Sequence, residues 1–397
     1  MVFRPAITLR TQICLKEILS QGSFKALLWL SLGCFFYGLS VGMNVSNFGI
    51  FLYHNNLQAN IISDILSFEI IGNIVAAPFV LILCIKCGMF RLLAISLIIR
   101  NVFLVLFGVS DNVLLFKISM FGFGVGGFIL YVLIFQWVNR LASNEKRATY
   151  ISIASMAFGL GIAFGPFLTA YLEMPSNINF NISAILSTVM LAFVIIAKQY
   201  EPVVFPFRKM TLYKLFIFAQ IPVMCAIASE YAYFGISDFL PLFLINLGKI
   251  KQDAYTLLGY FSLSGILLSI PMGIICDRFD RTKLTIVIAV IMICAIEILP
   301  MVIDNFFLTL IIFTLLSASL NALIVVTLAI LGDKFVGDDL LAAGSMVHAM
   351  STIGGYAGIT ITGNIMHRLG TDGFIFSFSS LFLVFLVLLL WESYKHK

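Results

Sequence analysis

The chain has 397 residues, of which 61% are apolar and only 11% are charged, with a net charge of +5. A soluble domain carries about a quarter of charged residues, so this composition excludes an ordinary soluble enzyme, a disordered chain and a secreted disulfide scaffold. The small positive charge gives no indication of nucleic-acid binding. The composition indicates an integral membrane protein, and at roughly 30 to 35 residues per span and connection the length allows about twelve helical spans.

Twelve apolar runs, bounded by charged residues, Gly, Pro or Asn, predict these spans in chain order. They cover residues 27–53, 59–85, 91–109, 113–139, 150–172, 181–199, 212–246, 254–275, 284–302, 306–331, 340–366 and 373–391. The limits at 113, 302 and 306 are the least distinct. Alternating ten-residue segments typical of an outer-membrane barrel are absent from the sequence. The predicted fold is an all-α polytopic membrane protein.

Basic residues predict the orientation of these spans. Nineteen of them fall on the side that holds both termini, and three, Lys249, Lys251 and Arg368, fall on the other. Because cytoplasmic loops are enriched in Lys and Arg, both termini are predicted to be cytoplasmic. The expected organisation is an N-terminal cytoplasmic segment over 1–26, six-helix bundles over 27–199 and 212–391, a cytoplasmic connection over 200–211 and a tail over 392–397. Two halves of six spans are typical of secondary transporters built from repeats.

Cofactor and enzyme motifs are not found in the sequence. Seven scattered cysteines include one CxxC pair, Cys84 and Cys87, for which we expect no metal or redox role. The run GFGVGG at 122–127 lies inside an apolar span without a preceding strand, so it indicates helix packing and not a nucleotide loop. We therefore expect no enzyme activity, no cofactor and no bound metal.

One charged loop names a family. Residues 273–283, GIICDRFDRTK, resemble the loop motif of the major facilitator superfamily, usually G-x-x-x-D-R-x-G-R-R, although Asp280 replaces the second Gly and Thr282 breaks the basic pair. The equivalent loop of the first half, at 85–91, is a degraded copy. Residues 161–166, GIAFGP, resemble the Gly-Pro motif associated with antiporters in this superfamily. The stretch from Pro222 to the loop motif looks like the bacterial drug-efflux and sugar-efflux branches.

The resemblance implies two six-helix halves with pseudo-twofold symmetry and transport by alternating access in a bacterial cytoplasmic membrane, by a monomer. The expected partners are a small-molecule substrate, protons and the lipid bilayer, with no nucleic acid. Proton-linked efflux of a small organic solute is the first hypothesis, and a proton-linked importer of a sugar, nucleoside or osmolyte is the second. A passive facilitator or a polytopic membrane enzyme is the alternative of a different class. Because span 1 has no acidic residue and span 4 has no embedded Arg, the drug-antiporter hypothesis is weaker.

Two further sets of residues have a structural and a functional interpretation. The loop residues are either a topology anchor or, as the resemblance implies, a cytoplasmic gate latch: Gly273, Asp277, Arg278, Asp280, Arg281 and Lys283. Small residues spaced along helices favour close helix contacts. They form either static packing or, since spans 5 and 8 and spans 2 and 11 meet in the superfamily, sliding gate surfaces: Gly161, Gly165, Pro166, Gly265, Ser269, Gly354 and Gly358.

Ionisable and polar residues inside the spans are candidates for the coupling and substrate site, because charges in a bilayer are costly. Glu69 and Arg100 lie at similar depth, which predicts either a fixed ion pair or a proton-sensitive one. Glu230 lies in mid-span without a cation along its helix, so it suits a proton carrier, and Asp238 follows two turns later. The other candidates are Tyr231, Tyr233, His348, Asn44, Asn47 and Gln136.

Overall fold

The structure is a computed structural model that describes the backbone of residues 9–141, 147–202, 220–335 and 338–395. It describes the side chains of these ranges from Phe24 onward, apart from residues 81, 147–149, 270, 277, 338–342, 345, 346, 348 and 393–395. In this part of the chain every element is helical, which confirms the predicted all-α class.

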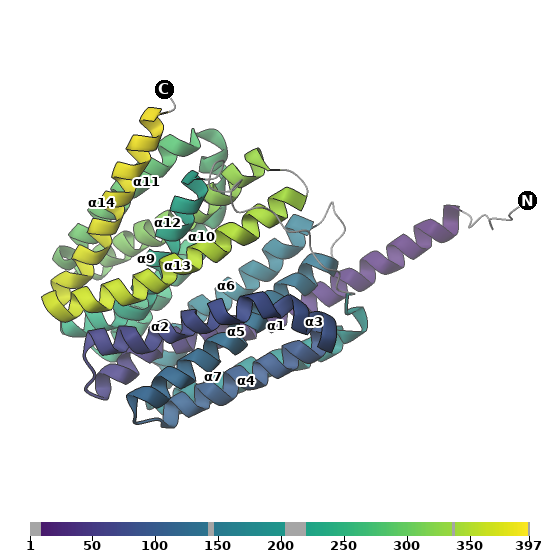
Figure 1. The fold of residues 1–397 in the computed structure, drawn as a ribbon, viewed down its shortest axis with the longest axis horizontal. Coiled ribbons are helices and arrows are strands. Elements are labelled where there is room, and N and C mark those ends of the chain that lie inside the picture. Colours follow the sequence, from purple (N-terminus) through teal and green to yellow (C-terminus); the bar gives the residue numbers. More distant parts are fainter. Residues whose placement is uncertain (1–8, 142–146, 203–219, 336–337, 396–397) are drawn as a thin grey trace, which may run out of the picture.

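The helices form two groups in chain order. The first group comprises α1 (Leu9–His54), α2 (Ala59–Ala76), η1 (Ala77–Phe79), α3 (Val80–Cys87), α4 (Met89–Val109), α5 (Val113–Leu141), α6 (Arg147–Leu172), α7 (Ser176–Ala197) and η2 (Lys198–Tyr200). The second group comprises α9 (Gln220–Asn246), α10 (Lys251–Arg278), α11 (Arg281–Val302), α12 (Phe306–Lys334), α13 (Asp338–Leu369) and α14 (Thr371–Lys395). Figure 1 shows the first group in the lower part of the molecule and the second group above it.

The helix limits follow the apolar runs closely, with two differences. α1 begins at Leu9, well before the apolar run. The run over 59–85 is interrupted by the short helix η1, which contains Pro78. Proline cannot donate a backbone hydrogen bond, and its ring disturbs the preceding turn, so the span divides into α2 and α3.

Nine helices in the described ranges are long and apolar enough to cross a membrane. The main contacts between the groups are made by α9 with α1, α10 with α6 and α13 with α2. A helix that is shielded by protein needs less apolar surface than one in lipid, so polar residues are tolerated where the groups meet. The number of twelve spans stays a prediction.

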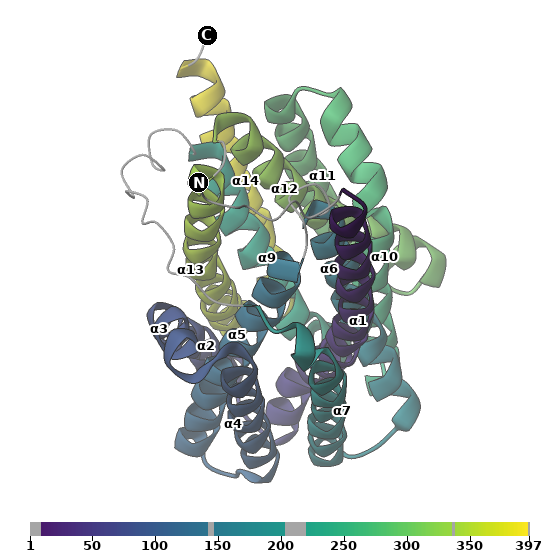
Figure 2. The ribbon, with the colours of Figure 1, turned by 90° about the vertical axis from the view of Figure 1, so that its right-hand side faces the viewer.

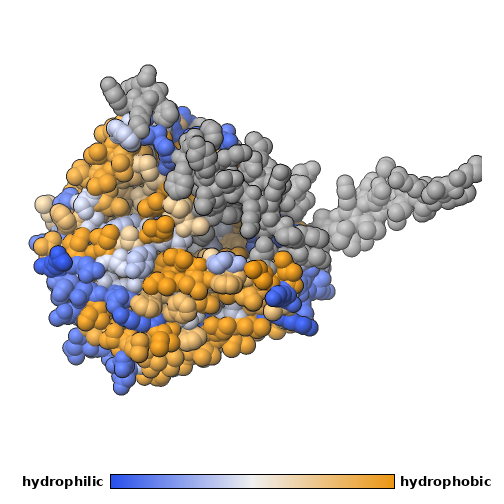
Figure 3. All heavy atoms as spheres, viewed as in Figure 1, coloured by the Kyte–Doolittle hydropathy of each residue, from blue (hydrophilic) through white to orange (hydrophobic). Residues whose placement is uncertain are grey.

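Apolar side chains cover much of the outer surface. Ile98, Leu328 and Val387, on three different helices, are each about 60% exposed. In Figure 3 a broad hydrophobic surface extends between hydrophilic edges. A water-soluble protein does not expose apolar area of this extent, so the surface fits a lipid environment.

Candidate functional site: a central cavity between the two groups

A cavity of about 310 Å³ lies where the two groups meet. The first group contributes Tyr37, Val41, Asn44, Val45, Phe48, Glu69, Ile70, Asn73, Arg100, Phe123, Gly127, Phe128, Tyr131, Phe158 and Ile162 to its wall. The second group contributes Ser229, Glu230, Tyr233, Phe234, Ile324, Ser351 and Thr352. Figure 2, which views the molecule from its N-terminal side, shows α5 and α9 near the middle between the groups. Eight of these 22 residues are aromatic, and a few carry a charged or amide side chain.

One face of α1 forms part of this wall. Residues 37, 41, 44, 45 and 48 follow the three- and four-residue spacing of a single helix face. Gly38 and Gly42 bring α1 into backbone contact with α6, where a Cβ on either glycine would overlap the carbonyl of Phe158 or Ile162. The cavity face of α1 is therefore held by close packing on its neighbour.

Arg100 of α4 is a buried cation on the cavity wall, with only 1% of its surface exposed. Its Nη2 donates to Ser40 Oγ at 3.1 Å and its Nη1 donates to Asn101 Oδ1 at 3.2 Å. The guanidinium also lies over the rings of Phe123 and Tyr37, at 4.7 and 5.2 Å from their centroids. Hydroxyl, amide and aromatic groups thus hold the guanidinium by hydrogen bonds and cation–π contacts.

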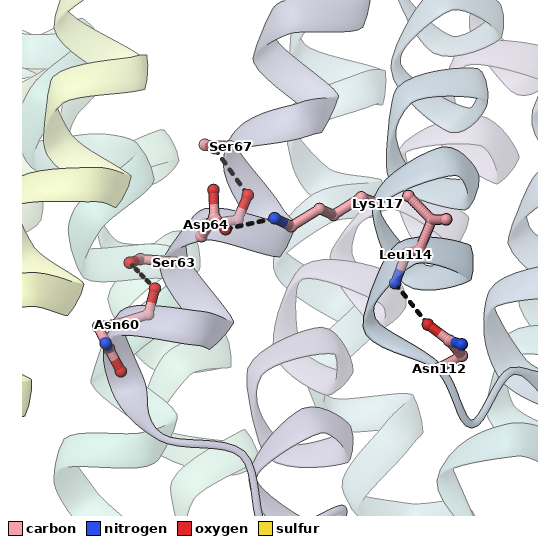
Figure 4. A network of polar contacts seen from close by, with 7 residues as sticks. All are labelled: Asn60, Ser63, Asp64, Ser67, Asn112, Leu114 and Lys117. Atoms are coloured by element: carbon pink, nitrogen blue, oxygen red, sulfur yellow. Dashed lines mark hydrogen bonds and ion pairs between the residues drawn. The ribbon is translucent and has the colours of Figure 1, made fainter.

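The expected ion pair between Glu69 and Arg100 does not form. Both residues line the cavity, but the ion pairs among the described residues are Lys117–Asp64, Lys249–Asp304 and Arg281–Asp333. Figure 4 shows the first of them, which joins α5 to α2. Arg100 is held by neutral groups instead, and Ser40 and Asn101 accept from two of its five N–H donors. Both carboxylates on the wall, Glu69 and Glu230, are therefore without an ion-pair partner in the described structure.

Glu230 lies on the part of α9 that faces the cavity, opposite the first group. Tyr233, three residues later on the same helix face, is beside it on the wall. Tyr131 of α5 lines the same cavity from the first group. Glu230 and Glu69 thus belong to one cavity although they come from different groups of helices.

Two candidates on α9 lie away from the cavity wall. The Tyr231 hydroxyl shares a hydrogen bond of 2.8 Å with Ser377 Oγ of α14, within the second group. Asp238 is buried, and its backbone oxygen would lie 2.7 Å from a Cβ on Gly49 of α1. Tyr231 is rotated by one residue from Glu230, and Asp238 is about 12 Å further along the helix, so neither reaches the space that Glu230 faces.

Asn47 lies in a contact between the groups that we call the closed end, made of Asn47, Ser176, Lys251 and Tyr255. Asn47 Nδ2 donates to the Ser176 carbonyl at 2.9 Å, and the Tyr255 hydroxyl donates to Asn47 Oδ1 at 2.9 Å. Lys251 Nζ donates to Ser176 Oγ at 3.0 Å. These bonds connect α1 and α7 to α10. At the opposite end of α10, α12 and α13 no described atom lies within 4 Å of a Cβ built on Gly273, Gly332 or Gly344.

Asn44, one turn before Asn47, has a different environment. It is 1% exposed and lies on the cavity wall, and neither its Oδ1 nor its Nδ2 has a hydrogen-bond partner among the described residues. Of the remaining candidates, Gln136 lies on α5 away from the cavity wall. His348 belongs to α13, and its side chain is outside the described part.

The charged loop is held within the second group. Asp280 caps α11, since its side chain accepts from Lys283 N at 2.8 Å. Arg281 donates to the Ala329 carbonyl at 2.9 Å and pairs with Asp333, both on α12. Arg278 and Lys283 are exposed, and the Asp277 side chain is outside the described part. The described contacts anchor the loop to its own group, and a latch stays a prediction.

The small-residue stripes also pack inside each group. Gly161 and Gly165 of α6 face the backbone of α1, with Pro166 buried beside them, and Gly265 of α10 faces Ser317 and Asn321 of α12. Gly354 and Gly358 of α13 face Ile227 and Tyr231 of α9. Ser269 bonds its own helix through the Ile266 carbonyl. The contact between α2 and α13 instead involves Gly363 and Ser63. The stripes therefore match the static-packing alternative and not surfaces between the groups.

The sequence interpretation missed most of the wall. Tyr37, Phe123, Phe128, Tyr131 and Phe158 belong to it, as do Asn73, Ser351 and Thr352. The chain holds 39 Phe and 13 Tyr, and nothing in the local sequence separates a cavity aromatic from one facing lipid. Tyr233 was already a candidate from the sequence, and it lies three residues from Glu230 on the same helix face.

Comparison with known proteins agrees with this architecture. Residues 30–265 and 223–397 match the family model described as Major Facilitator Superfamily. A relative in Bacillus subtilis (strain 168), the uncharacterized MFS-type transporter YfkF, is 24% identical over 173 residues. That match spans 42% of this chain and 44% of the relative, less than half the length of either.

Solved structures with the same fold cover nearly the whole chain. A mutant of the nucleoside transporter NupG superimposes with a TM-score of 0.77 at 13% identity, over 92% of this chain and 98% of that one. A bacterial homolog of the human lysosomal transporter Spinster, in an inward-facing and unoccupied conformation, superimposes with a TM-score of 0.71 at 11% identity, over 93% and 95%. At such identities the similarity shows the fold alone.

Proposed function

The chain belongs to the Major Facilitator Superfamily, whose members are secondary transporters that work by alternating access, and we propose that it exchanges a small organic solute for protons. In the presence of an inward proton gradient such an exchanger exports the solute. The central cavity is the solute site, and Glu230 carries the coupled proton.

One observation carries this proposal: Glu69 and Glu230 face the same cavity from opposite groups, and neither has an ion-pair partner among the described residues. An isolated carboxylate in a dry cavity is costly to ionise and binds a proton readily, whereas access to water lowers the cost of ionisation. Alternating access therefore loads and releases the proton as the cavity opens to each side.

Exchange, and not co-transport, follows from the position of these carboxylates. They are part of the wall that a solute contacts, in a cavity of about 310 Å³. A solute that fills this space and bonds to an ionised carboxylate takes the place of the proton. Solute and proton thus compete for one site, which is the requirement for antiport.

The orientation and organisation are part of the proposal. Twelve spans with both termini in the cytoplasm place the closed end at the outer face of a bacterial cytoplasmic membrane. The structure then represents an inward-facing state, in which the bonds around Asn47 shut the outer side. The two six-helix bundles, 27–199 and 212–391, act as the two units that rock against each other.

The test is solute accumulation in proteoliposomes, driven by a pH gradient, with a panel of organic cations, neutral aromatics, sugars and nucleosides. Glu230→Gln carries a neutral side chain like that of the protonated acid, so we expect it to lose gradient-driven accumulation while solute-for-solute exchange persists. Glu69→Gln is expected to lower accumulation in part. The matched control is Glu297→Gln, an exposed acid of α11, which should transport as the unmodified protein does.

Two results would refute coupling by Glu230. Full gradient-driven accumulation by Glu230→Gln would show that another group carries the coupled proton. Transport by the unmodified protein that does not respond to the pH gradient would indicate a passive facilitator.

A further inference from the structure

We infer that Asn44 is the group that selects the solute, and that the solute is a flat aromatic heterocycle with an N–H and a C=O next to each other, as in a lactam. This inference rests on the proposed transport function and deepens it by naming the class of substrate.

The first step is the unusual state of the Asn44 amide. It is 1% exposed, yet neither Oδ1 nor Nδ2 has a partner among the described residues. A buried polar atom without a partner lowers stability, so most buried polar atoms in native proteins are hydrogen-bonded. Asn44 retains two such atoms, and the residue belongs to the wall of the central cavity.

The second step is the contrast with Asn47, one turn further along α1. Both amide atoms of Asn47 are bonded, to the Ser176 carbonyl and to the Tyr255 hydroxyl. Asn60, Asn139 and Asn179 each also have a buried Oδ1 without a partner in the described part of the chain, whereas at Asn44 both amide atoms are in this state.

The third step is the chemistry that an asparagine amide prefers. Its Nδ2 donates and its Oδ1 accepts, side by side in one plane. The complementary ligand edge has an acceptor beside a donor, so that two parallel hydrogen bonds form. A cyclic amide presents this edge in a rigid form, and an ester, an ether or a tertiary amide does not.

The fourth step is the shape of the remaining wall. Eight of its twenty-two residues are aromatic, and aromatic rings stack favourably on flat molecules. A cavity of about 310 Å³ is at the small end of the range for ligand sites, which suits a molecule of one or two fused rings. The polar edge of such a molecule meets Asn44 while its faces contact the aromatic side chains.

The test uses two probes that differ by one methyl group, quinolin-2-one and its N-methyl derivative, which lacks the N–H donor. Binding to the purified full-length protein is measured at one pH and without a gradient, by equilibrium dialysis. We expect the unmodified protein to bind quinolin-2-one at least about tenfold more tightly, because the methyl group leaves a buried acceptor unpaired. In Asn44→Leu, which keeps the branched shape and the number of heavy atoms but has no polar side-chain atom, the two probes are expected to bind equally.

Two further variants serve as controls. Asn44→Ala gives a second protein without the amide, in case the leucine variant is not monodisperse. Asn364→Leu removes an amide of α13 that is bonded to the Thr360 carbonyl and is not on the wall, and the preference between the probes should persist in it. Equal affinity of both probes for the unmodified protein, no binding of either probe, or a preference that survives in Asn44→Leu or Asn44→Ala would overturn the inference.

This experiment is separate from the test of proton coupling. Loss of the probe preference with normal proton-driven transport would refute the substrate class alone. A clear preference at Asn44 together with flux that ignores the pH gradient would refute coupling and leave the binding site in place.

Discussion

The Tyr255 hydroxyl of α10 donates a hydrogen bond of 2.9 Å to the amide oxygen of Asn47 on α1, and so connects the two groups of helices at a buried point. Asn47 in turn donates to the Ser176 carbonyl of α7. A chain of neutral hydrogen bonds therefore joins α10, α1 and α7 at this point. Such bonds are strong enough to hold a state and weak enough to open during a transport cycle, since each contributes about 1 kcal/mol.

Removing this hydroxyl should loosen the closed end. Tyr255→Phe keeps the ring and loses the hydrogen bond, so we expect opening at this end to be favoured by about 1 kcal/mol, or roughly fivefold. Amide hydrogen exchange over residues 251–258 should become faster by a similar factor. Tyr260→Phe, five residues later on α10, is the control, because Tyr260 makes ring contacts with Phe167 and Phe306. Equal exchange in both variants would show that the bond does not hold this end.

Replacement of Arg100 by lysine should impair transport. The guanidinium donates to Ser40 and Asn101 while it stacks over Phe123 and Tyr37, and an ammonium cannot make these planar contacts together. We expect Arg100→Lys to reduce transport at least tenfold with the protein still folded, as judged by size-exclusion chromatography. Arg91→Lys, an exposed residue of the same helix, should leave transport unchanged. Normal flux in Arg100→Lys would show that a buried positive charge is sufficient at this position and that the planar contacts are not required.

The glycine contact between α6 and α1 should be sensitive to a single methyl group. A Cβ on Gly161 would overlap the backbone of Phe35 and Leu39, whereas a Cβ on Gly273 has open space. Gly161→Ala is therefore expected to destabilise the fold by about 1–3 kcal/mol, and Gly273→Ala by almost nothing. Thermal unfolding followed by chromatography compares the two. Equal melting temperatures would mean that the helices separate at no cost.

The sequence predicted the helices well, because in an apolar chain the length of each apolar run and the charged residues, Gly, Pro or Asn at its ends are sufficient to locate a helix. It could not predict which way each helix faces, since the usual amphipathic period is lost when both lipid and protein faces are apolar. Tyr231 and Tyr233 illustrate this. Both closely follow Glu230 in sequence, but Tyr231 bonds to Ser377 and Tyr233 lines the cavity.

The sequence also could not predict where along a helix the cavity lies. Asn44 and Asn47 lie on nearly the same face of α1, and one turn separates a cavity residue from a residue of the closed end. Asp238 and Glu230 differ in the same way along α9. The partners of Arg100 were also out of reach, because Ser40 and Phe123 come from distant parts of the chain.

The direction of proton movement during solute release tests the central claim most directly. Proteoliposomes are loaded with a transported solute from the panel and a pH indicator, and are then diluted into solute-free buffer without a pH gradient. Exchange predicts that the lumen acidifies as solute leaves, and that Glu230→Gln abolishes the signal while Glu297→Gln retains it. A lumen that becomes alkaline, or one whose pH does not change while the solute leaves, would contradict exchange of solute for protons.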